Sequence, residues 1–184
     1  MKAPLSLKSY RDAAAGVAFE YPPNWKQVRK TSGFSPPFAF SESNPATVIV
    51  EFMSAGTAYE NTNIESLDFV YGWSKANSTS ACRKRTNFEY FDDTRTMRRV
   101  IHGVAFDRAA GGEGSAGHLI HSQIYAAYRD GTCYIFEEDF TRTAPDVGSE
   151  RTLTHEEQLA LQRSLDRIMQ SVVFTSSQPP KPTP

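Results

Sequence analysis

The chain has 184 residues, and its 20 lysines and arginines nearly balance its 21 aspartates and glutamates, which leaves a formal net charge of -1 at pH 7. A chain of this length buries roughly 70% of its unfolded surface in one domain, and its balanced charge gives no broad positive field for nucleic acid or an anionic membrane. Its two cysteines form no C-x-x-C pair, which excludes the common zinc and dithiol motifs, and no apolar run approaches the ~18 residues of a membrane span.

The N-terminal sequence MKAPLSLKSYRDAAAG lacks the continuous apolar core of a signal peptide. We expect residues 1–9 to be an extension, residues 10–175 to be a single domain and the proline-rich residues 176–184 to be a disordered tail. The chain as written is therefore expected in the cytoplasm. A trimmed precursor would instead belong to the periplasm or to the secreted proteins.

The first predicted strand covers Val17 to Tyr21, where apolar residues alternate with Ala18 and Glu20. It must end there, because the two prolines that follow cannot donate to a strand ladder, and Trp25 can then fold back as an apolar plug. A second strand is predicted over TVIVEFM, residues 47–53.

A helix is predicted next. Thr62 and Glu65 have the spacing of a capping box, and an apolar stripe that includes Leu67 and Val70 follows at helical intervals towards Ala81. The amphipathic pattern indicates that this helix lies on an apolar surface.

Further strands are predicted over residues 88–91 and 97–106, and the strongest hairpin signal is IYAAYRDGTCYIF, in which Asp130 and Gly131 fit a two-residue type I′ turn. Both faces of this hairpin are apolar, so it needs cover on both sides. The turn predicts two cross-strand pairs, Tyr125 with Phe136 and Gln123 with Glu138.

Thr154 and Glu157 form a second capping box before an apolar stripe. Two helices and a two-faced antiparallel hairpin predict an α+β protein, a three-layer α/β/α sandwich with a central, mainly antiparallel sheet. The stripe consists of Leu161, Leu165, Ile168 and Val172.

The stretch AAGGEGSAGH, residues 109–118, has the G-x-G-x-x-G spacing of a dinucleotide-binding loop. That motif works between a strand and a helix whose N-terminal amides face the pyrophosphate. Here the residues that follow are typical of a strand, so we interpret the stretch as a flexible hairpin loop and expect no nucleotide cofactor.

One side-chain cluster could carry metal chemistry. If the glycine stretch closes symmetrically, His102 lies near His121 across the ladder, and His121 lies diagonal to Glu138. A one-residue slip in either turn separates the three side chains, and a hydrogen-bonded polar end of the sheet is the alternative interpretation. For Cys82 and Cys133 the sequence leaves a disulfide open, which would imply an oxidising compartment.

The segment GVAFEYPPNWKQV, residues 16–28, followed by strands, a helix, a hairpin and a last helix that ends in IMQSVVF, resembles the PsbP-like superfamily over Tyr10 to Phe174. The resemblance implies a central antiparallel sheet between helices and a binding or assembly role without a shared catalytic centre. It assigns no active-site residue. The matching positions are Phe19, Tyr21, Pro22, Trp25, Ser171 and Phe174.

The sequence therefore predicts a noncatalytic module that binds a protein partner through a sheet edge, the glycine-rich stretch or an exposed aromatic patch, with no cofactor and no nucleic-acid partner. The alternative is a metal-binding protein or metal-dependent enzyme that uses His102, His121 and Glu138. A third hypothesis is a small-ligand pocket between the sheet and a helix.

Overall fold

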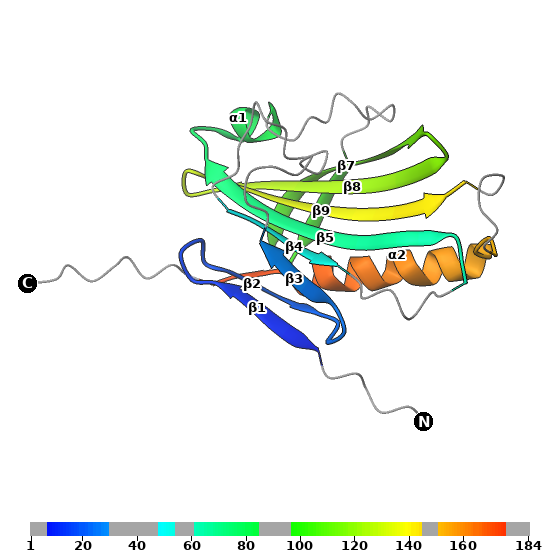
Figure 1. Ribbon diagram of the computed structural model, residues 1–184. Coiled ribbons are helices and arrows are strands. Elements are labelled where there is room, and N and C mark those ends of the chain that lie inside the picture. Colours follow the sequence, from blue (N-terminus) through cyan, green and yellow to red (C-terminus); the bar gives the residue numbers. More distant parts are fainter. Residues whose placement is uncertain (1–6, 30–47, 54–60, 85–96, 145–150, 176–184) are drawn as a thin grey trace, which may run out of the picture.

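The computed structural model describes residues 7–29, 48–53, 61–84, 97–144 and 151–175, and within these residues the chain forms two antiparallel sheets (Figure 1). The smaller sheet has the order β1-β2-β10 and the larger one the order β3-β4-β5-β9-β8-β7-β6. The strands are β1 (Lys8–Asp12), β2 (Val17–Tyr21), β3 (Lys26–Arg29), β4 (Val48–Met53), β5 (Ile64–Lys75), β6 (Met97–Ile101), β7 (Val104–Ser115), β8 (His118–Arg129), β9 (Thr132–Thr143) and β10 (Val173–Phe174).

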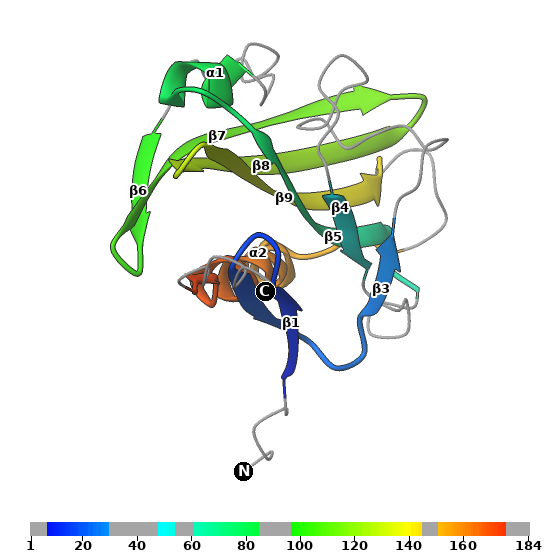
Figure 2. The same cartoon turned by 90° about the vertical axis from the view of Figure 1, so that its left-hand side faces the viewer.

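Helices lie on both sides of the larger sheet. Helix α2 (His155–Gln170) and the smaller sheet cover one face, and the short helix α1 (Thr79–Arg83) lies over β8 and β9 on the other, as Figures 1 and 2 show. The predicted α+β class, an antiparallel sheet between helical layers, is therefore confirmed.

The core has one apolar cluster on each face of the larger sheet. The cluster under α2 is rich in aromatic rings, and Phe136 contacts Phe19, Phe69, Tyr71 and Phe106 at centroid distances of 5.1–6.4 Å. The smaller cluster under α1 includes Val70, Cys82, Ala109, Ile124, Ala126, Cys133 and Ile135.

The hairpin of β8 and β9 has the predicted turn and register. Asp130 and Gly131 have φ values of 47° and 75°, as a type I′ turn requires. Tyr125 pairs with Phe136 and Gln123 with Glu138. Alternation along the two strands then gives each face of the sheet its own apolar set, as expected.

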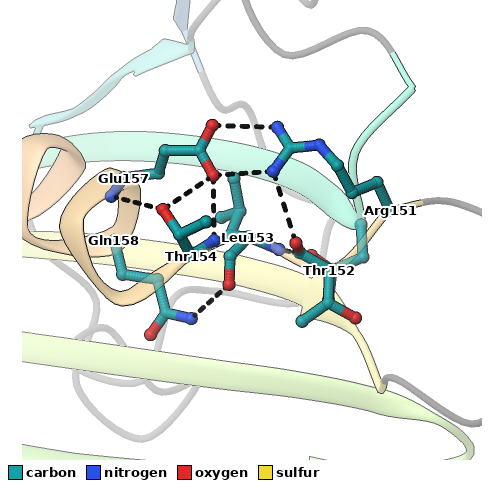
Figure 3. A network of polar contacts seen from close by, with 7 residues as sticks. Arg151, Thr152, Leu153, Thr154, Glu157 and Gln158 are labelled. Atoms are coloured by element: carbon teal, nitrogen blue, oxygen red, sulfur yellow. Dashed lines mark hydrogen bonds and ion pairs between the residues drawn. The ribbon is translucent and has the colours of Figure 1, made fainter.

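Helix α2 begins at the predicted capping box (Figure 3). The Thr154 hydroxyl accepts a hydrogen bond from the Glu157 backbone N–H at 3.2 Å, and the Glu157 carboxylate accepts one from the Thr154 N–H at 2.8 Å. Arg151 donates to both carboxylate oxygens of Glu157 at 2.8 Å, which lowers the pKa of Glu157 to about 2. Leu161, Leu165 and Ile168 are buried as predicted.

The predicted helix from Thr62 to Ala81 is wrong. Residues 64–75 form β5, the strand between β4 and β9, and only Thr79–Arg83 are helical. A strand buried on both faces has apolar side chains at nearly every position, so helical intervals can also be found in it. The rings of Phe69 and Tyr71, two residues apart on one face, were the signal for a strand.

A disulfide joins Cys82 of α1 to Cys133 of β9, and both cysteines are buried. The sequence left this bond open. It attaches α1 to a central strand, so the helical cover of this face is covalently fixed.

The predicted strand over residues 97–106 is divided by a turn at His102 and Gly103, whose φ values are 47° and 78°. Strand β7 then continues through most of the glycine-rich stretch and pairs with β8, and the hairpin turn is confined to Ala116 and Gly117. The expected flexible loop is therefore mostly paired strand. The predicted strand at 88–91 and the predicted tail at 176–184 lie outside the described residues.

Candidate functional site

Polar side chains interrupt the apolar face of the larger sheet beneath α2. Glu138 of β9, Gln123 of β8 and Arg108 of β7 share this face, because every second residue of a strand points to the same side. Together with Gln162 and Leu165 of α2 they line a cavity of about 220 Å³, called here the Glu138 cavity.

The carboxyl group of Glu138 is the most unusual group in this cavity. The residue is 1% exposed, and neither carboxyl oxygen has a hydrogen-bond partner. Removal from water raises the pKa of Glu138 to about 8, with a further rise from the Asp166 carboxylate, while Arg99 and Arg108 act in the opposite direction. At neutral pH the carboxyl is therefore mostly protonated.

The polar groups beside Glu138 are bonded to one another. Arg108 donates from Nε to the Gln123 side-chain oxygen at 3.1 Å, and the Tyr125 hydroxyl donates to the same oxygen at 3.3 Å. Arg99 donates to the Tyr125 hydroxyl at 3.0 Å and to the Asp166 carboxylate at 2.9 Å. This network links β6, β7 and β8 to α2 without using Glu138.

His121 and Gln162 are exposed lining residues, so the cavity opens to solvent where they lie. The His121 ring stacks on Phe140 at a centroid distance of 6.1 Å. Partial burial and the nearby Arg142 lower the pKa of His121, which keeps the imidazole neutral at pH 7.

The structure brings together His121 and Glu138 of the predicted metal cluster and leaves His102 elsewhere. His102 lies in the β6–β7 turn and bonds the Gln170 carbonyl oxygen at 2.8 Å, whereas Gly112 occupies the position opposite His121. The prediction was wrong because it closed the hairpin symmetrically within the glycine stretch, whereas the turn lies at Ala116 and Gly117, and because it continued one strand through His102. Within the described residues no group of three or more His, Cys, Asp or Glu side chains is suited to a metal ion.

Sequence reasoning missed the other members of the site. The hairpin register already placed Gln123 opposite Glu138 on an otherwise apolar face, and that pair was a usable signal. Arg99 and Asp166 come from β6 and α2, and no local pattern shows that these two elements meet.

The opposite side of the sheet carries a basic groove of about 520 Å³, called here the arginine groove, which is lined by Arg83, Arg98 and Arg129 and by the acidic Asp107. Arg83 lies 3.4 Å from the Asp107 carboxylate. Strand β6 borders the groove, and among the described strands only β7 pairs with it. Its Val100 side chain is 65% exposed.

None of the helices in the described part of the chain has the length and apolar character needed to cross a membrane. No protein-family model matches the chain, and no curated protein matches it.

The solved structures that are similar to this chain include three of low sequence identity. A crystal structure from Bacteroides thetaiotaomicron has a TM-score of 0.54 and 12% identity, over 92% of this chain and 48% of that one. LpqN, involved in cell envelope biogenesis of Mycobacterium tuberculosis, has a TM-score of 0.49 and 11% identity, over 95% and 87%. Cyanobacterial PsbP from Synechocystis has a TM-score of 0.43 and 14% identity, over 94% and 95%.

This chain thus spans about half the length of the Bacteroides chain. At these identities the likeness concerns the fold alone. The antiparallel α+β architecture expected from the resemblance is present.

Proposed function

We propose that this chain is a noncatalytic protein-interaction module whose partner binds along the edge strand β6 and the adjoining arginine groove. The observation that carries the proposal is the outer side of β6, which has no paired strand among the described residues, beside the exposed side chains of Arg98 and Val100. An edge strand presents a row of backbone donors and acceptors to an incoming segment.

Charge indicates the chemistry of the partner. Three arginine residues and one aspartate line the groove, and the Asp107 carboxylate already lies near Arg83. An extended segment that carries acidic side chains would pair with β6 and place its charges against Arg98. Of the three surfaces considered from the sequence, the sheet edge is favoured, because the glycine-rich stretch is itself a paired strand.

The proposal includes no catalytic role and assigns the module to an oxidising compartment, periplasmic or extracellular. The buried Cys82–Cys133 bond supports the compartment, since disulfides persist where thiols are not kept reduced. The same bond means that neither cysteine supplies a thiolate nucleophile.

The test compares two matched double variants in quantitative affinity capture from the native organism. The first variant, Arg98→Gln with Val100→Thr, alters β6. The control makes the same two kinds of change away from β6: Arg11→Gln on β1 of the smaller sheet, and Val28→Thr on β3, the other edge strand of the larger sheet. A partner that is retained by the wild type and the control and lost from the β6 variant supports the proposal. Equal retention by both variants contradicts it, as does a partner without an acidic segment.

A further inference from the structure

We propose that the Glu138 cavity binds a small organic amine, whose ammonium group forms an ion pair with the Glu138 carboxylate. This site lies on the α2 side of the sheet, opposite the arginine groove, and does not depend on the proposed function. The cavity has walls of Arg108, Gln123 and Glu138 and of the apolar residues Phe140 and Leu165, with His121 at its opening.

The first argument is the unsatisfied carboxyl group. A buried polar group without a hydrogen bond costs free energy, and native proteins leave few such groups. Glu138 is buried, both of its oxygens lack partners, and it belongs to the lining of the cavity. An occupant with several N–H donors would satisfy both oxygens at once.

The second argument is charge. Arg99 is bonded to Asp166 and Tyr125, and Arg108 is bonded to Gln123, so both nearby guanidinium groups already have acceptors. Among the buried side chains that line the cavity, the Glu138 carboxyl is the group without a partner, and the Asp166 carboxylate adds negative potential at Glu138. A cationic donor fits this arrangement better than an anion, which would lie against the carboxyl oxygens.

The third argument is size. A cavity of about 220 Å³ has room for roughly seven waters at about 30 Å³ each, so it fits a ligand of about that number of non-hydrogen atoms. Phe140 and Leu165 provide an apolar surface for a short alkyl chain. A metal ion would need additional ligands, and the described residues gather no suitable group of three.

Binding must release a proton below about pH 8, because the protonated Glu138 carboxyl loses its proton to solvent when the ammonium ion arrives. The affinity should therefore rise between pH 6 and pH 8. Strand β5 places the uncharged Phe69 beside Glu138. The charged or titratable groups on the surrounding elements are His121 and Tyr125 of β8, Asp139 and Arg142 of β9, Arg108 of β7, Arg99 of β6 and Asp166 of α2.

The experiment titrates the full chain with butylamine and, as matched probes of similar size, with butyrate and butanol, by calorimetry at pH 8. The proposal expects that, of the three probes, only butylamine binds saturably to the wild type. The Glu138→Gln variant should bind butylamine at least about tenfold more weakly than the wild type. The control Glu156→Gln removes an exposed carboxylate from the first turn of α2 and should bind like the wild type.

A second measurement does not depend on how the variant folds. In the wild type, butylamine should shift the imidazole NMR signals of His121 and leave those of the exposed His155 unchanged. Preferential binding of butyrate or butanol, unchanged affinity in Glu138→Gln, or no saturable binding together with unmoved His121 signals would overturn the proposal.

Discussion

At the scale of single residues, Gly112 shows why a glycine is needed inside a paired strand. A Cβ atom at this position would lie 2.5 Å from the backbone oxygen of Ile120 and 3.2 Å from Nδ1 of His121. A flexible side chain could change its rotamer to avoid this Cβ atom, but the backbone of β8 cannot. With a Cβ atom at position 112, β7 and β8 would therefore have to move apart.

Gly112→Ala should therefore lower the free energy of unfolding by about 1–3 kcal/mol, the usual cost of overpacking. Gly114→Ala is the control, because its added Cβ would meet the end of the flexible Leu119 side chain at 3.1 Å. Urea denaturation of both variants measures the difference. Equal midpoints would show that β8 moves away without cost.

The glycine-rich stretch also shows what residue-level reasoning achieves. The argument that no helix follows Gly117 is correct, and β8 stands in that place. The assignment of all the glycines to a loop is wrong, because Gly111, Gly112 and Gly114 pair with β8. The close approach of β8 that Gly112 permits is a tertiary feature, which the sequence does not display.

At the scale of elements, the disulfide between α1 and β9 fixes a helix of only five residues. So short a helix is marginal in isolation. The two cysteines are 51 residues apart, and the chain-entropy relation gives a stabilisation of about 4 kcal/mol for a loop of that length.

We expect Cys82→Ala with Cys133→Ala to lower the free energy of unfolding by up to this amount, about 4 kcal/mol. Guanidinium denaturation of the variant, and of the wild type with and without reductant, provides the measurement. Reduction should weaken the wild type and leave the variant unchanged. A wild type whose midpoint does not move after reduction, verified by thiol labelling, would contradict the expectation.

The accuracy of the predicted elements depended on where their signals lie. The β8–β9 hairpin and α2 carry their signals locally, in Asp130-Gly131 and in the Thr154–Glu157 capping box, and both were predicted correctly. Strand β5 is determined by its neighbours β4 and β9 on either side. Its apolar run is compatible with a buried strand or a helix, and only tertiary pairing decides between them.

At the scale of the whole molecule, the alternation of side chains gives the two faces of one sheet different chemistry. Arg108 of β7 lines the Glu138 cavity, and its neighbour Asp107 lines the arginine groove. The sequence could predict that both faces need cover. It could not predict the polar site under α2, because that site requires α2 and four strands in their final positions.

Buried Glu138 should make the stability of the whole fold depend on pH. Its pKa rises from 4.5 to about 8 on folding, so over this range the folded chain keeps a proton that the unfolded chain has lost. The stability that the folded chain gains from this retained proton is complete below pH 4.5 and is lost as the pH rises to about 8. The free energy of unfolding should fall by at most about 1.4 kcal/mol per pH unit through this carboxyl.

The pH dependence of stability that comes from Glu138 is best measured between pH 7 and pH 8, because the other groups with a shifted pKa act outside this window. The lowered pKa of His121 changes stability below its ordinary value of 6.5, and the lowered pKa of Glu157 acts between 4.5 and about 2. Urea denaturation at several pH values should show wild-type stability falling across this window and a flatter profile for Glu138→Gln, with Glu156→Gln as the control that keeps the wild-type slope. If the Glu138→Gln profile falls as steeply as that of the wild type, another group carries the proton and the Glu138 carboxyl is ionised in the folded protein.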